Sequence, residues 1–291
     1  KVKSRFLFHL TAAFICLLFL TGCNVLQTHE KGNNTGAWTQ KPFKDNPDNF
    51  QFAVVADRTG KMRPGVFEGA VSKLNLLQPE FVVSIGDLRK GYTHDAEIIN
   101  SEYDEMDQIL EGLEMRFFRL AGNHDISNEL MLNIYQQRYG RPWYHFTYKD
   151  VLFLMLYTED TDDHISVTQA EYFVNILKDN QNVRWTFVFV HRPVFVKDRK
   201  DTSRNWRLIE KELKARPHTV FAGHWHRYIN WEKYGQNCIN VATTGGGSDL
   251  GGMEKGEFDH LVWITMTEKG PVIANLMLDG IYDRDLNSKK Q

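Results

Sequence analysis

The chain has 291 residues, 42% of them hydrophobic, and a formal net charge of -2. A chain of this length can bury a sizeable core as one large domain or two small ones. Because basic and acidic residues nearly balance, no overall field draws the protein onto nucleic acid or anionic lipid. Recognition of phosphate must therefore come from a local arrangement of residues.

The N-terminal segment is typical of a secretion signal. A basic start precedes an apolar stretch over residues 6–20, which is short for a spanning helix. The sequence LTGC at residues 20–23 resembles the lipobox of bacterial lipoproteins, which implies a removed signal peptide over residues 1–22 and a diacylglycerol on Cys23. The alternative is an uncleaved N-terminal membrane anchor. Either reading places the rest of the chain outside the cytoplasm.

The sequence after residue 22 predicts one globular domain between two polar segments. Residues 23–49 contain glycine and proline without sustained periodicity, so we expect a flexible tether. We expect a globular domain over residues 50–283 and a disordered charged tail over residues 284–291. Cys238 lies in an apolar run and is expected to be a buried core thiol.

Short apolar runs alternate with amphipathic helical patterns in this domain, which is typical of an α/β layered fold. The strand-like runs cover residues 52–56, 81–85, 117–121, 185–190 and 219–222. Helices are expected over residues 66–77, 96–114 and 129–139, from a capping box at 168–171 through 177, and around 206–213. Residues 144–157 predict a hairpin, and strands alone are expected after residue 228.

Each of the five strand-like runs is followed by side chains that can bind metal. These are Asp57, Asp87, Asn123 with His124 and Asp125, His191, and His224 with His226. Ligands in such sheets collect at the carboxyl ends of strands, where loops leave the rigid scaffold. Mixed carboxylate and imidazole ligands suit Mn, Fe or Zn, and the absence of thiolates argues against a structural zinc. Because the set is too large for one ion, we expect two divalent ions.

The motifs Gly-Asp at 86–87, Gly-Asn-His-Asp at 122–125 and Gly-His-Trp-His at 223–226 resemble the calcineurin-like metallophosphoesterase superfamily. The resemblance implies a four-layer sandwich of two β-sheets flanked by helices. It also implies a role for each residue that matches the family's motifs. Asp57 and His226 would bind one ion, Asn123, His191 and His224 the other, Asp87 would bridge them, and His124 would protonate the leaving alkoxide with Asp125 holding its ring.

The activity that the resemblance implies is hydrolysis of a phosphomonoester or phosphodiester by hydroxide held between the ions. The substrate would be a small-molecule or nucleotide phosphoester, and a nuclease or cyclic-nucleotide phosphodiesterase would share the same chemistry. Nucleophilic catalysis by serine or cysteine is disfavoured, since the sequence has no Gly-x-Ser-x-Gly elbow and no catalytic cysteine signature.

The first motif departs from the family pattern. The sequence reads Asp57-Arg58-Thr59, where the family has Asp-x-His. A threonine hydroxyl is a weak neutral ligand, so we expect lower affinity for one ion while catalysis is kept. The alternative is a surface protein of the same fold that binds a partner but has lost one ion and turnover.

Residues close to the expected ligands are candidates for substrate binding. Arg58, Arg89 and Arg192 each lie one or two residues from an expected ligand and could clamp a substrate phosphate, and Thr59 could contact substrate. The glycine-rich segment over residues 245–252 does not have the Gly-x-Gly-x-x-Gly spacing of a nucleotide loop. We expect it to form a mobile loop near the site.

Overall fold

The computed structural model describes residues 39, 41–162, 164–196 and 203–284. The chain divides into two compact units, Lys1–Lys44 and Asp45–Gln291. In the first unit only residues 39 and 41–44 are described, and these belong to no helix or strand. The expected signal peptide, Cys23, most of the expected tether and nearly all of the expected tail lie outside the described residues. Among the described residues, no helix has the length and hydrophobicity needed to cross a bilayer.

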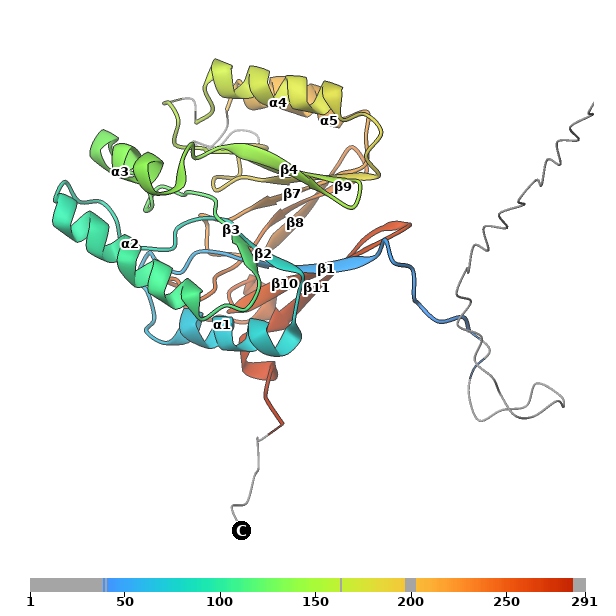
Figure 1. The fold of residues 1–291 in the computed structure, drawn as a ribbon, viewed down its shortest axis with the longest axis horizontal. Coiled ribbons are helices and arrows are strands. Elements are labelled where there is room, and N and C mark those ends of the chain that lie inside the picture. The colour runs from blue at the N-terminus through green and yellow to red at the C-terminus, as the bar shows by residue number, and fades with distance from the viewer. Residues whose placement is uncertain (1–38, 40, 163, 197–202, 285–291) are drawn as a thin grey trace, which may run out of the picture. The chain divides into compact units, whose positions relative to one another are not determined.

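The second unit is built on two mixed β-sheets (Figure 1). The first sheet has the order β11 (Gly270–Met277), β10 (His260–Thr267), β1 (Phe50–Val55), β2 (Phe81–Ser84) and β3 (Arg116–Phe118). The second has the order β4 (Tyr144–Tyr148), β5 (Val151–Met155), β6 (Trp185–Phe189), β7 (His218–Ala222), β9 (Gln236–Asn240) and β8 (Ile229–Lys233). Strands β1 to β3 run parallel, as do β5, β6, β7 and β9, so their carboxyl ends meet at common edges.

Aromatic side chains from both sheets fill the space between them. Phe52 of β1 packs edge-on against Phe153 of β5 and Phe187 of β6, with ring centroids 5.4 and 5.1 Å apart. All three side chains are fully buried in one core cluster. Alternate residues of a strand point to opposite faces, so the same strands present their other side chains to the helices. This dry interior supports the strand ends that carry the expected ligands.

Helices cover the outer faces of the two sheets, which completes four layers (Figure 1). On the first sheet lie α1 (Val66–Leu77) and α2 (Ala96–Glu111), and α3 (Glu129–Tyr139) packs beside α2. On the second sheet lie α4 (Val167–Asp179) and α5 (Trp206–Leu213). The expected four-layer α/β fold is therefore confirmed.

Two expected boundaries and one cap are wrong. Strand β3 ends at Phe118, although apolar residues continue to 121, because the chain there turns into the Gly-Asn-His-Asp segment. Helix α2 ends at Glu111 and does not reach residue 114. Helix α4 is capped by Ser166, whose hydroxyl accepts a hydrogen bond from the backbone N–H of Gln169. The expected cap, Thr168, lies inside the helix, because Ser166 caps it two residues earlier, and the side chain of Gln169 pairs with the backbone of Tyr157.

Candidate metal centre

Loops that leave the carboxyl ends of the parallel strands bring six of the expected side chains together. Two overlapping groups of ligand atoms could each hold a metal ion, and within each group the atoms lie within 4.8 Å of one another. The enclosed group consists of Asp87, His191 and His224, and the open group consists of Asp57, Asp87 and His226. Asn123 joins the enclosed group, since its Oδ1 lies 3.0 Å from Nε2 of His191. Asp87 belongs to both groups, which agrees with a bridging role.

The donors fit a pair of divalent cations. Oδ2 of Asp87 lies 3.2 Å from Nε2 of His191, and Oδ1 of Asp57 lies 3.4 Å from Nε2 of His226. Both carboxylates are buried, and a buried charge is stable only beside a partner of opposite charge. Carboxylate oxygens and imidazole nitrogens are the ligands that such cations prefer.

Glycines let the loops approach these carboxylates closely. A Cβ at Gly122 would lie 2.3 Å from Oδ1 of Asp87, and a Cβ at Gly223 would lie 2.4 Å from Oδ2 of Asp57. Real side chains do not tolerate such distances, so any larger residue would push the carboxylates away. Gly122 and Gly223, the first residues of the two histidine-containing motifs, are therefore part of the site.

Four of the expected ligands have a strained backbone. Asp57, Asp87, His224 and His226 have positive φ angles of 42°, 56°, 69° and 52°. A non-glycine residue in this region costs about 1–3 kcal/mol and persists only where the surroundings hold it. Here the N–H of Thr59 donates to the carbonyl of Asp87, and the N–H of His224 donates to the carboxylate of Asp57. Such strain concentrates at functional sites.

Backbone carbonyls orient the two histidines that approach the carboxylates. Nδ1 of His191 lies 2.9 Å from the carbonyl of Ile85, and Nδ1 of His226 lies 2.6 Å from the carbonyl of Gly247. A carbonyl can only accept, so each Nδ1 carries the proton and each Nε2 faces the site. This is the tautomer that a metal ligand needs.

Burial and charge act in opposite directions on Asp87 and His191. Burial by itself raises the pKa of Asp87, but the charge and hydrogen bond of His191 bring it down to about 2. Burial by itself lowers the pKa of His191, but the charge and hydrogen bond of Asp87 raise it to about 10. Asp87 is therefore ionised at neutral pH, and the two groups hold opposite charges in the absence of another cation.

The glycine-rich loop is packed rather than loose, which corrects the expectation of a mobile loop for residues 245–247. A Cβ at Gly246 would lie 2.4 Å from the carbonyl oxygen of Asp57, so the loop presses on the segment after β1. Arg63 ties it in place, because its guanidinium donates to the carbonyl of Gly246 and, with two contacts of 2.6 Å, to the carboxylate of Asp259.

The expected contact between Asp125 and the ring of His124 is not made. Nδ1 of His124 instead lies 2.7 Å from the carbonyl of Lys90. The carboxylate of Asp125 accepts hydrogen bonds from the backbone N–H groups of Asp87, at 2.6 Å, and Leu88, at 3.1 Å. Consecutive side chains leave this turn in different directions, so Asp125 holds the loop that carries Asp87 and does not hold His124.

The family model for calcineurin-like phosphoesterases matches residues 50–228. The chain belongs to this family. Family membership and the phosphatases among its structural neighbours support phosphoester hydrolysis as the general activity and two metal ions as the general requirement. A search of the curated proteins finds no significant match.

Solved structures share the fold of this phosphoesterase at low sequence identity. A dimetal phosphatase from Danio rerio is 14% identical with a TM-score of 0.55, over 79% of this chain and 99% of that chain. GAP50, described as the anchor in the inner membrane complex of Plasmodium, is 14% identical with a TM-score of 0.58, over 80% and 86%. A purple acid phosphatase from yellow lupin is 15% identical with a TM-score of 0.57, over 81% and 53%. Identities this low show the fold alone.

Two of the arginines expected to bind substrate have other partners in this phosphoesterase. The buried guanidinium of Arg58 donates to the carbonyl of Leu88 and to Glu105. Arg89 is only 2% exposed, lies 3.5 Å from the centre of the Tyr103 ring and donates to its hydroxyl. Both arginines brace α2 against the loop after β2, so the expectation that they clamp phosphate is corrected. A long side chain can carry its charged group away from the backbone segment to which it is attached. Closeness to a ligand in the sequence therefore does not show where the charged group of an arginine lies.

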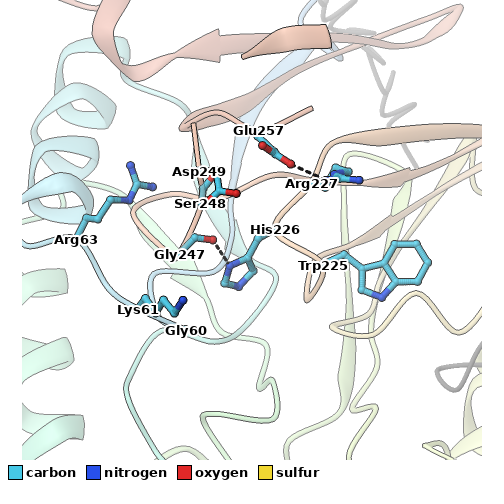
Figure 2. A pocket seen from close by; sticks show the side chains of 10 residues that line it. All are labelled: Gly60, Lys61, Arg63, Trp225, His226, Arg227, Gly247, Ser248, Asp249 and Glu257. Carbon is cyan, nitrogen blue, oxygen red and sulfur yellow. Dashed lines mark hydrogen bonds and ion pairs between the residues drawn. The ribbon is translucent and has the colours of Figure 1, made fainter. Parts of the chain in front are cut away.

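Arg192 does reach the centre. One of its guanidinium nitrogens lies 2.8 Å from Nε2 of His224, and Nε donates to Glu159. Arg192 also lines a cavity of about 460 Å³ beside Asn123. A second cavity of about 480 Å³ lies beside His226 (Figure 2). Cavities thus border ligands of both groups.

Figure 2 shows the ring of His226 beside the carbonyl of Gly247, with Trp225 and Arg227 among the other residues that line the cavity. Lys61 also lines this cavity. Sequence reasoning missed Arg63 and Lys61, because neither stands in a motif. Their position shortly after Thr59 was the only signal, and it is weak.

Proposed function

We propose that this phosphoesterase hydrolyses a small-molecule or nucleotide phosphate ester, monoester or diester, with two divalent ions of the Mn, Fe or Zn type. The observation that carries the proposal is the position of Asp87 in both groups of ligand atoms. One carboxylate shared by two groups is the arrangement needed to hold two ions side by side.

The ions would supply Lewis acidity and a water of lowered pKa when bound. The chain's own contribution is to place the reacting groups. A Cβ at Gly60 would lie 2.8 Å from Cε1 of His226 and 3.9 Å from Nε2 of His124, so both rings lie close to the same face of Gly60. The backbone carbonyl of Lys90 accepts from Nδ1 of His124, which leaves Nε2 to deliver a proton to the departing oxygen.

The phosphate would be bound by residues beside one or the other of the two cavities. Arg192 offers a planar guanidinium beside His224, which suits bidentate contact with phosphoryl oxygens. Lys61 and the buried Thr59 are the corresponding candidates beside the open group. We propose that the open group binds its ion more weakly, because Thr59 stands where the family supplies an imidazole.

The test is turnover by the second compact unit, from Asp45 onward, with Mn(II). Bis-p-nitrophenyl phosphate reports diesterase activity and p-nitrophenyl phosphate reports monoesterase activity. The His226→Ala variant should abolish turnover of the preferred ester. If wild type and variant are equally inactive on both esters with each of several divalent metals, phosphoester hydrolysis of this kind is rejected.

A binding protein without turnover is the second candidate. Two observations favour it: Thr59 replaces a ligand, and GAP50, which is described as an anchor, has a similar fold. Equilibrium dialysis separates the candidates when it is combined with the turnover assay. Two ions per chain with turnover support the enzyme, whereas one ion per chain without turnover supports the binding protein.

We also propose that the domain is displayed outside the cytoplasm of a bacterium on a lipid attached to Cys23. The proposal is supported by the LTGC sequence and the apolar stretch before it. Metabolic labelling with a radioactive fatty acid should label the full chain but not the Cys23→Ser variant. Equal labelling of both would reject lipidation at this residue.

A further inference from the structure

Tyr92 contacts two residues of the proposed centre at once, although no motif includes it. Its hydroxyl oxygen accepts a hydrogen bond of 2.8 Å from Nδ2 of Asn123. Its ring meets the imidazole of His124 edge to face, with centroids 4.7 Å apart and an interplanar angle of 86°. Tyr92 nevertheless remains 60% exposed. An exposed aromatic residue that contacts an expected ligand and the expected proton donor needs a reason beyond packing.

The backbone holds Tyr92 in this place at a conformational cost. Its φ angle is 54°, a region that costs a non-glycine residue about 1–3 kcal/mol. On one side, a Cβ at Gly91 would lie 1.8 Å from the carbonyl oxygen of His124, so only glycine permits this approach. On the other side, Nδ2 of Asn128 donates to the carbonyl of Thr93 at 2.9 Å. The segment around Tyr92 is therefore held against the Gly-Asn-His-Asp turn on one side and against the N-terminus of α3 on the other.

The hydrogen bond to Tyr92 matters because the two ends of an amide are chemically different. Only the oxygen of Asn123 can bind a cation, and its NH2 group would repel one. With Nδ2 donating to Tyr92, Oδ1 faces Nε2 of His191 at 3.0 Å, inside the enclosed group. Rotation of the amide by half a turn would instead turn Nδ2 toward the enclosed group.

We propose that Tyr92 is a positioning residue with two functions, an inference that rests in its second part on the proposed hydrolysis. Its hydroxyl anchors the amide of Asn123 so that Oδ1 faces an ion in the enclosed group. Its ring limits the rotation of His124, so that Nε2 of His124 points to the leaving group. Tyr92 also lines the cavity of about 460 Å³, where the same ring forms a wall against substrate.

The first part is tested by metal binding alone. Calorimetric titration with Mn(II) should show that Tyr92→Phe lowers the affinity for one of the two ions by about tenfold. This loss is at the lower end of the range for residues that support a metal ligand. In an Asn123→Ala background the same substitution should have no further effect, because the amide that Tyr92 orients is gone. Unchanged Mn(II) affinity in Tyr92→Phe, or an equal loss in both backgrounds, would overturn this part.

The second part is tested by the dependence on the leaving group at saturating Mn(II). Tyr92→Leu should lower kcat about tenfold for phenyl phosphate esters, which need a proton on the departing oxygen, and much less for p-nitrophenyl esters. Equal losses on both kinds of ester would overturn it. If wild type turns over no ester, the proposed function fails, and the calorimetric result still decides the first part.

Tyr234 provides a matched control. It also has a positive φ angle, 56°, and is 48% exposed, but it lies in the turn between β8 and β9. Tyr234→Phe and Tyr234→Leu should leave Mn(II) affinity and the leaving-group dependence unchanged. Effects as large as those at Tyr92 would show a general loss of stability and would overturn the assignment to Tyr92.

Discussion

The enclosed and open groups of expected ligands share Asp87 but differ in how they are supported. His191 of the enclosed group is fully buried, and its Nδ1 is held by the carbonyl of Ile85, next to strand β2. His226 of the open group has a side chain that is 19% exposed and is held by the carbonyl of Gly247, in the glycine-rich loop. Each group includes one half-buried histidine, and cavities border ligands of both groups. Only the open group is affected by Thr59, which stands where the family's first motif has an imidazole.

The difference shows two ways of holding a ligand. The carbonyl of Ile85 directly follows β2, whose ladder fixes it, so His191 should keep its orientation under most substitutions in loops. The open group depends on a loop that is held by Arg63 and by close glycine contacts. We therefore expect one tightly and one weakly bound ion, and the following predictions test that contrast.

The largest effect is expected from Gly122→Ala, because the new side chain would displace Asp87, the residue that the two groups share. The new Cβ would lie 2.3 Å from Oδ1 of Asp87 and 2.7 Å from Nδ1 of His191. Displacement of these side chains should lower kcat/KM at least about 10²-fold and lower the affinity for both ions. Gly69→Ala in α1 is the control, since its Cβ would meet only the end of Lys73 at 3.9 Å. Loss of only one ion would contradict a bridging Asp87.

The next effect concerns stability at acid pH. Buried His260 accepts from the N–H of Ala242 through Nε2, behind the chain that leads into the glycine-rich loop. Burial lowers its pKa to about 4, against about 6.5 in the unfolded chain. The unfolded state then binds the proton first, so the free energy of unfolding should fall by about 3 kcal/mol as pH drops from about 6.5 to 4.

Urea denaturation at a series of pH values measures this loss. His260→Gln replaces the imidazole by an amide, which can form hydrogen bonds but does not titrate, so the stability of the variant should fall less over the same interval. The remaining slope includes His218, whose pKa burial also lowers. Identical pH dependence in wild type and variant would reject a neutral buried His260.

A smaller effect is expected from Arg63→Ala. The substitution removes the donors to Gly246 and Asp259 that hold the glycine-rich loop. Mn(II) affinity should fall about tenfold at the open group and remain unchanged at the enclosed group. Equal weakening of both ions in a two-site titration would remove the contrast between the groups.

The smallest effect is expected from Thr59→His, which restores the family's ligand. The added imidazole should raise the affinity for the more weakly bound ion by less than about tenfold, because the ring must fit where a buried threonine now lies. Thr59→Val is the control, since it keeps the shape and removes the hydroxyl. A loss of affinity in Thr59→His would show that the position is too crowded for a fourth ligand.

Much of the centre was predictable because each ligand lies in the loop that follows an apolar strand. Periodicity and chain order place Asp57, Asp87 and His191 after strands, and parallel pairing of β1 with β2 brings Asp57 and Asp87 to one edge of the first sheet. Packing of the second sheet against the first then brings His191 beside Asp87. The helices at 66–77 and 129–139 were predicted correctly because their apolar spacing is regular. In these regions local pattern and tertiary structure agree.

The support of the centre could not be predicted. The direction in which Asp125 and Arg89 point depends on turns and partners that lie 14 to 38 residues away in the chain. The contact of Gly247 with His226 joins segments that no local pattern relates. The φ and ψ angles of the loop residues set the direction of each side chain after a strand end. Only the packing of the loops fixes these angles.

The sequence by itself determined the layered fold and the kinds of atoms that gather at the site, because strand and helix periodicity and residue chemistry are local properties. The tertiary structure decided which atoms face one another. It assigned Asp125 to the backbone of Asp87, directed Arg58 and Arg89 away from the site, and brought Tyr92 to Asn123. These choices depend on close packing between segments distant in the chain.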